Sequence, residues 1–173
     1  WNRKDALGLA LESVKKQTIF ECIETIVYDS NSSDGSPEYV EVKHPWAKLI
    51  KSDINPGLAE GRNILVRLAK APIVFWMDDD CELVEDDLLE KMLNFMNSNK
   101  QVGVLYANIP EGDEKIPFMH LYIPQDLKRN DYGDKCLMTS SFASGATCVR
   151  RSLFMACGGY DNDFFRMNVE NDF

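Results

Sequence analysis

Apolar and polar positions alternate between helix-like and strand-like spacing over residues 1–107. Apolar residues at helical spacing predict amphipathic helices over residues 2–17, 58–69 and 86–97. Short runs rich in β-branched and aromatic residues predict strands over residues 24–28, 48–51, 73–77 and 102–107. Strands that alternate with helices in this way run parallel and are joined by crossover helices. The pattern therefore predicts an α/β fold with a mostly parallel central sheet flanked by helices on both faces.

Residues 108–141 break this alternation, because prolines and charged residues interrupt the apolar pattern. We expect an excursion from the main sheet that shapes the pocket of a second substrate. His120 lies in the apolar part of this excursion, where a structural role is favoured over metal ligation or catalysis. Strand-like character returns over residues 142–149, where Gly145 permits a ligand to approach the backbone closely. His44, which precedes Pro45, is expected in an exposed loop.

The strand over residues 73–77 leads directly into three carboxylates, Asp78, Asp79 and Asp80. Ligands of open α/β sheets bind outside the carboxyl ends of the strands, so these side chains are candidates for a binding site. Crowded anions cost Coulomb energy that a divalent cation would offset. On an extended chain Asp78 and Asp80 point the same way and can share one metal, whereas Asp79 points elsewhere. The alternative is a solvated acidic turn ahead of the next helix.

Three other segments carry candidate chemistry. Residues 29–36 form a cluster of small polar residues, which predicts a loop that presents side-chain oxygens and backbone N–H groups. Arg62 falls near the start of a predicted helix, where the dipole disfavours a cation, so a functional role is indicated. Glu170 and Asp172 form a second pair of carboxylates near the end of the chain.

Composition narrows the function classes. The chain has 173 residues, enough for one domain with a core, and a net charge of −9, which disfavours non-specific binding to nucleic acid. Its 5 cysteines show no CxxC pair, which favours reduced thiols in a cytoplasmic setting. No apolar run approaches the ~20 residues of a membrane span. The sequence begins abruptly at Trp1 and ends at Phe173 inside an acidic motif, so we expect a piece of a longer protein. Any association with a membrane is then expected to depend on the missing sequence or on partners.

Five segments occur in an order that resembles one enzyme family. They are Asn2-Arg3 with the first helix, residues 28–36, residues 55–63, residues 77–80, and residues 144–165. Together they resemble glycosyltransferase family 2 of the GT-A type over nearly the whole chain. The family's opening strand is missing here, Ser30 and Asn31 depart from its loop, and Gly61 replaces an alanine. The resemblance implies one GT-A domain, with a nucleotide-sugar-binding half at residues 1–107 and an acceptor-side half at residues 108–173.

The resemblance also implies roles for single residues. Asp29 would accept hydrogen bonds from the nucleotide base, and Arg62 would reach the base or the phosphates. Asp78 would face the ribose and the metal, and Asp80 would bind a divalent Mn or Mg ion that bridges the diphosphate. The further residues assigned to nucleotide binding are Asp79, Gly57 and Gly145.

The catalytic base falls on the second carboxylate pair. The family's acidic motif aligns so that Glu170 would deprotonate the acceptor hydroxyl for displacement with inversion, with Asp172 as the alternative base. Val169 departs from the motif, and Glu170 stands where an aspartate is usual.

The implied activity is metal-dependent transfer of a sugar from a UDP- or dTDP-sugar to a glycan, lipid-linked or protein acceptor, by a chain that can form homo-oligomers. Two alternatives stay open. One is a sugar nucleotidyltransferase, since carboxylates after a strand also hold metal for phosphoryl chemistry. The other is a binding domain that keeps the GT-A fold without catalysis.

Overall fold

The computed structural model describes residues 1–107, 110–111, 114–117 and 145–163. The helices are α1 (Lys4–Lys15), α2 (Ser36–Lys43), α3 (Gly57–Leu68), α4 (Leu88–Ser98) and α5 (Arg151–Ala156), with a short 3-10 helix at Phe20–Cys22. The strands are β1 (Ile26–Asp29), β2 (Lys48–Lys51), β3 (Ile73–Met77), β4 (Val104–Tyr106), β5 (Pro110–Glu111), β6 (Glu114–Pro117) and β7 (Ala146–Arg150). The predicted alternation of helices and strands over residues 1–107 is confirmed, with boundaries shifted by a few residues.

The strands form a parallel pair of β1 and β2, an antiparallel group of β3, β7 and β4, and a separate antiparallel pair of β5 and β6. β1 and β2 are parallel, from Ile26 opposite Lys48 to Asp29 opposite Lys51. β7 lies between β3 and β4 and is antiparallel to both, so β3 and β4 run in the same direction. The parallel direction predicted within residues 1–107 therefore holds for β1 with β2 and for β3 relative to β4. The insertion of β7 between β3 and β4 is a feature that local periodicity does not encode.

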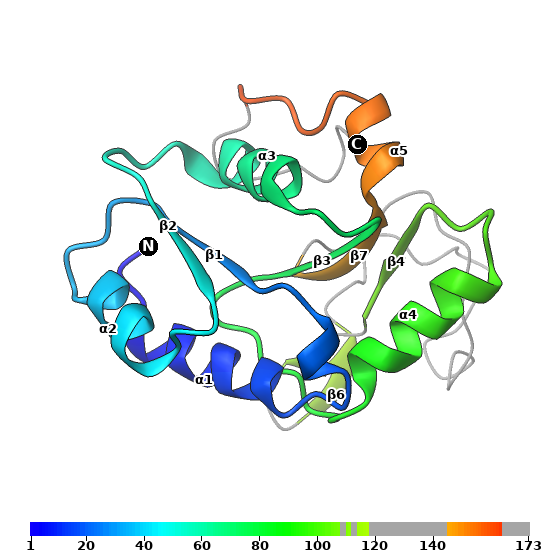
Figure 1. Ribbon diagram of the computed structural model, residues 1–173, viewed down its shortest axis with the longest axis horizontal. Coiled ribbons are helices and arrows are strands. Elements are labelled where there is room, and N and C mark those ends of the chain that lie inside the picture. The colour runs from blue at the N-terminus through cyan, green and yellow to red at the C-terminus, as the bar shows by residue number, and fades with distance from the viewer. Residues whose placement is uncertain (108–109, 112–113, 118–144, 164–173) are drawn as a thin grey trace.

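Helices cover both faces of the strands. α3 and α5 lie on one side, and α1, α2 and α4 lie on the other (Figure 1). Below α3 and α5 the core is formed by Val66, Trp76, Phe154 and Tyr160, all buried. On the other side Met92 and Met96 of α4 pack with Cys148 of β7. The two methionines are thus core residues, as their helical spacing predicts. Within the described residues, no helix combines the length and apolar character that a membrane span requires.

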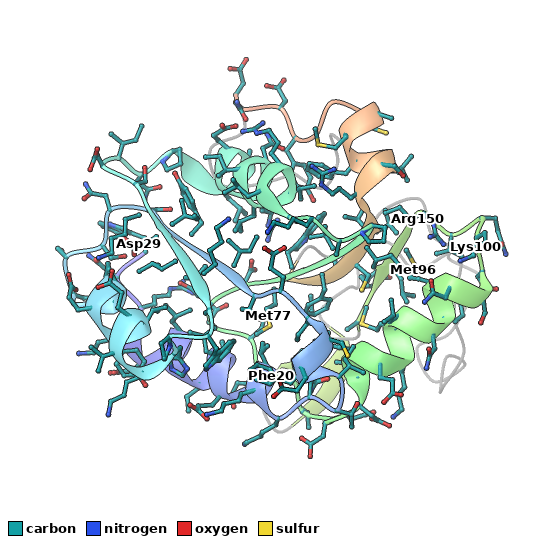
Figure 2. The ribbon with its side chains drawn as sticks, viewed as in Figure 1. Phe20, Asp29, Met77, Met96, Lys100 and Arg150 are labelled. Atoms are coloured by element: carbon teal, nitrogen blue, oxygen red, sulfur yellow. The ribbon has the colours of Figure 1, made fainter. Side chains whose placement is uncertain are left out.

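Two consecutive arginines, the last residue of β7 and the first of α5, hold helices on opposite faces. Arg150 donates from Nε to the Val102 carbonyl oxygen at 2.8 Å and from Nη2 to the Met96 carbonyl oxygen at 2.6 Å, at the end of α4 (Figure 2). Arg151 donates from Nε to the carbonyl oxygen of Val66, in the last turn of α3, at 3.0 Å. A cation at the C-terminal end of a helix satisfies free carbonyls and complements the dipole. The arginine pair therefore ties β7 to α3 and α4.

The expectation that His44 lies in an exposed loop is wrong. His44 ends α2, where its backbone N–H donates to the Val40 carbonyl oxygen at 2.9 Å, and its side chain is fully buried. The imidazole lies between the rings of Tyr39 and Trp46, with ring centroids at 5.5 and 5.6 Å. Burial lowers the pKa of His44, and the charge of Glu12 opposes this shift. The helix ends before Pro45, but a proline does not determine whether the preceding side chain points to solvent or into the core.

Candidate active site

The candidate site is built where β1 and β3 end and where α3 passes over β1. Asp29 is the last residue of β1, and Asp78 directly follows β3. Gly61 of α3 faces the Tyr28 ring of β1, where an added Cβ would lie at an ordinary contact distance of 3.7 Å. Arg62, the next residue of α3, reaches Asp78 after β3.

Arg62 and Asp78 are brought together as the sequence analysis expects. The Arg62 Nη2 atom donates to Asp78 Oδ1 at 2.7 Å. Arg62 is only 5% exposed, while the Asp78 side chain keeps 39% of its surface accessible. Burial raises the pKa of Asp78, Arg62 opposes the shift, and the neighbouring Asp80 and Asp79 add to it. The ion pair accounts for the cation in the second turn of α3, since it compensates the first carboxylate of the acidic triplet.

The backbone of Asp78 is also fixed. Its N–H donates to the Gly145 carbonyl oxygen at 2.9 Å, which extends the β3–β7 pairing by one step. Gly145 therefore lies directly beside Asp78, and its assignment to nucleotide binding stays a prediction. Gly57, the other glycine assigned to this role, begins α3 with φ of 84°, and its N–H donates to the Asn55 side chain at 3.0 Å. The left-handed φ at this position favours glycine.

Asp29 is buried and organises the loop that follows it. Its Oδ2 accepts a hydrogen bond from the Ser32 N–H at 2.9 Å, and its carbonyl oxygen accepts one from the Ser52 N–H at 3.0 Å. Further along the loop, Asp34 accepts hydrogen bonds from the Ser36 hydroxyl and from the Lys4 N–H, which lower the pKa of Asp34 to about 2. The polar loop over residues 29–36 is therefore held by its own aspartates and by the segment that precedes α1.

Arg3 belongs to a motif that carries the family resemblance, but no role was predicted for it, and the structure places it against the acidic triplet. Its Nη1 donates to Asp79 Oδ1 at 3.1 Å and forms an ion pair with Asp80 Oδ2. The charges of Asp79 and Asp80 raise the pKa of Arg3. β3 ends at Met77 and residues 79–80 form a turn, so the strand alternation that would align Asp78 with Asp80 does not extend through the triplet. Asp78 thus pairs with Arg62, and Arg3 pairs with both Asp79 and Asp80.

Asn63 connects α3 to the turn that leads toward the predicted catalytic base. Its Oδ1 accepts from the Tyr160 N–H at 2.9 Å, and its Nδ2 donates to the Tyr160 carbonyl oxygen at 2.8 Å and to Asn162 Oδ1 at 2.9 Å. Gly159 allows this approach, because its φ is 79° and an added Cβ would lie 2.5 Å from Asn63 Oδ1. Glu170, Asp172 and His120 lie outside the described residues.

The carboxylates fit one type of metal site. Among the described residues no group of three or more His, Cys, Asp or Glu side chains is arranged to hold a metal by itself. Mg²⁺, however, is commonly bound by one or two carboxylates together with substrate phosphates and water. Asp80 is 51% exposed and adjoins Asp78 at the same edge of the strands. These carboxylates therefore suit a divalent ion that is coordinated partly by the protein and partly by the oxygens of a diphosphate.

Comparison with known proteins places the chain in a family. It matches the family model described as glycosyl transferase family 2 over residues 1–158. An uncharacterized glycosyltransferase of Haemophilus influenzae is 27% identical over 165 residues, which cover 92% of this chain and 53% of the relative. WfaP of Escherichia coli, a UDP-Glc:alpha-D-GlcNAc-diphosphoundecaprenol beta-1,3-glucosyltransferase, is 28% identical over 109 residues, 62% of this chain and 42% of the relative.

Solved structures agree on the fold. The mannosyltransferase PcManGT from Pyrobaculum calidifontis, in complex with GDP-Man and Mn²⁺, superimposes with a TM-score of 0.73 at 21% identity, covering 94% of this chain and 46% of that chain. This likeness shows the GT-A fold. The chain spans about half the length of the curated relatives that it matches. Because the family model covers most of the chain, the chain belongs to glycosyl transferase family 2.

Proposed function

We propose that this chain forms the donor-binding part of a metal-dependent, inverting glycosyltransferase that moves a sugar from a nucleoside-diphosphate sugar to an acceptor hydroxyl. The observation that carries the proposal is the ion pair between Arg62 of α3 and Asp78, the residue after β3. Its arginine is almost fully buried. It fixes a cation at the binding edge of a chain whose net charge is −9. An anionic diphosphate requires such a local reversal of charge.

The proposed roles follow from position and chemistry. Asp29, buried at the end of β1, accepts hydrogen bonds from the nucleotide base, and Arg62 contacts the base or the phosphates. Asp78 faces the ribose, and Asp78 and Asp80 would hold the Mn or Mg ion. When bound, that ion stabilises negative charge on the leaving nucleoside diphosphate. Asp79, Gly57 and Gly145 belong to the same nucleotide-binding edge.

The acceptor side is assigned to residues 108–173. Glu170 takes the proton of the acceptor hydroxyl as the oxygen attacks the anomeric carbon, and the bond from that carbon to the diphosphate breaks on the opposite face, which inverts the configuration. Asp172 is the alternative base. Because the hydrogen bonds of Asn63 hold the turn at Tyr160, the segment that carries both carboxylates starts from a fixed point beside α3.

The relatives support the donor class. PcManGT was solved with GDP-Man and Mn²⁺, and WfaP is named for UDP-Glc and a lipid-linked acceptor. A glycan, lipid-linked or protein acceptor is consistent with these relatives. The family match favours glycosyl transfer over nucleotidyl transfer, which would instead release pyrophosphate from a nucleoside triphosphate.

A thermal-shift screen tests the donor and the metal together. UDP, dTDP and GDP are each added with Mn²⁺ or with EDTA, and one of them is expected to raise the melting temperature only when Mn²⁺ is present. Asp80→Asn should remove this stabilisation. Glu82→Gln, an exposed residue with the same charge change two positions away, should keep it. Equal stabilisation in Mn²⁺ and in EDTA would refute the metal dependence.

The catalytic base is tested separately from binding. Glu170→Gln should leave the melting-temperature shift intact while abolishing release of the nucleoside diphosphate in a transfer assay. Unchanged transfer in this variant, with loss in Asp172→Asn, would move the base to Asp172.

A further inference from the structure

We propose that Arg3 is a tethered counter-ion that competes with the divalent cation for Asp79 and Asp80, so that the cation binds well only together with a diphosphate. The proposal rests on the metal site of the proposed function. Its starting point is that Arg3 Nη1 donates to Asp79 Oδ1 at 3.1 Å and pairs with Asp80 Oδ2. A guanidinium on Asp80 Oδ2 occupies an oxygen that a metal ion would need.

The backbone on both sides of Arg3 is anchored to the polar loop. The Asn2 N–H donates to the Ser32 hydroxyl at 3.0 Å, and the Ser33 N–H donates to the Asn2 side chain at 2.8 Å. After Arg3, the Lys4 N–H donates to Asp34 Oδ2 at 2.9 Å. Arg3 is thus held near the carboxylates by its neighbours, and its own side chain is not needed to keep the segment in place.

The two arginines at this edge differ in how easily they exchange partners. Arg62 is 5% exposed, and its shielding from water strengthens its ion pair with Asp78. The Arg3 side chain is 45% exposed and that of Asp80 is 51% exposed. Ion pairs between solvated groups are weak and are screened by salt. Arg62 is therefore the more firmly paired of the two arginines, whereas Arg3 can leave Asp79 and Asp80.

A diphosphate resolves the competition, because it offers oxygens to both cations. A guanidinium binds phosphate oxygens as readily as carboxylate oxygens. Arg3 can therefore move from Asp80 to the diphosphate when the metal takes Asp80. Metal binding and diphosphate binding then favour each other, and by linkage each raises the affinity of the other by the same factor.

The test measures Mn²⁺ alone, without nucleotide, by titration calorimetry at low salt. A unit charge about 5 Å from a divalent ion, in a water-like dielectric with some screening, changes the affinity by roughly five- to tenfold. Arg3→Gln should tighten Mn²⁺ binding by this factor, and Arg3→Lys should stay near the wild type. Lys4→Gln is the matched control, because it removes the same charge one residue away, and no ion pair of Lys4 is found among the described residues. It should change Mn²⁺ affinity by less than about twofold.

A second arm measures the coupling itself. The factor by which saturating UDP or GDP tightens Mn²⁺ binding should shrink in Arg3→Gln by about the same five- to tenfold. Asp80→Asn distinguishes a failure of the proposed competition by Arg3 from a failure of the proposed metal site. If Mn²⁺ binding requires Asp80 but is unchanged or weakened in Arg3→Gln, the competition is overturned and the metal site stands. If Asp80→Asn leaves Mn²⁺ binding intact, the metal site of the proposed function is wrong, and the competition falls with it.

Discussion

Asn63 offers the sharpest test of how α3 is joined to the turn that follows α5. The side chain is buried, and it exchanges two hydrogen bonds with the backbone of Tyr160, at 2.9 Å to the N–H and 2.8 Å to the carbonyl oxygen. Asn63→Ala removes both of these hydrogen bonds to buried backbone groups beside the aromatic core. An unsatisfied buried polar group costs about 1–3 kcal/mol. The expected loss in the free energy of unfolding is therefore about 2–5 kcal/mol.

Asn63→Asp separates hydrogen bonding from volume. The carboxylate has nearly the same shape, but it places an acceptor where Nδ2 donates to the Tyr160 carbonyl oxygen and to Asn162 Oδ1. Burial and these facing oxygens raise the pKa of the new carboxyl above its unfolded value of about 3.9. The protonated acid can donate to Tyr160, so the penalty should be small at low pH and grow as pH rises toward the folded pKa. The destabilisation relative to wild type is thus expected to be larger at pH 8 than at pH 5.

Urea denaturation followed by tryptophan fluorescence measures both variants, since Trp76 packs in the same cluster as Tyr160. Asn162→Ala is the matched control, because it removes one bond from an exposed residue and leaves both Tyr160 bonds intact. It should cost less than about 1 kcal/mol. If Asn63→Ala cost no more than Asn162→Ala, the reasoning would be refuted, because the Tyr160 backbone would then be satisfied without Asn63.

Two further perturbations test the fold around the site. Arg150→Ala removes charge-assisted hydrogen bonds to the carbonyl oxygens of Val102, Met96 and Asn99. It should lower the free energy of unfolding, measured by urea denaturation, by about 2–3 kcal/mol. A loss under about 0.5 kcal/mol would show that water replaces the guanidinium at the end of α4. Burial holds the pKa of His44 below its ordinary value of about 6.5, so its contribution to stability is complete above that pH and is lost as pH falls toward the folded pKa. His44→Gln should remove this part of the pH dependence of stability below about pH 6.5, and an unchanged slope would assign it to other groups.

The sequence by itself determined the local elements and the chemistry at their ends. Apolar spacing identified α1, α3, α4 and the strands β1 to β4, because each periodicity is set by residues close together in the chain. The same local logic put Asp29 and Asp78 at the carboxyl ends of strands, and it marked Arg62 as a cation that its helix position does not favour. Family motifs added roles to these positions.

The tertiary structure decided which of these groups meet. Arg3 lies 76 residues from Asp79, and Asn63 lies 97 residues from Tyr160, so no local pattern links either pair. The insertion of β7 between β3 and β4, the anchoring of two helices by Arg150 and Arg151, and the burial of His44 likewise depend on how distant segments pack. Periodicity reports which face of an element is apolar, whereas the partner of a polar side chain is fixed only when the layers assemble and each buried donor and acceptor must be satisfied.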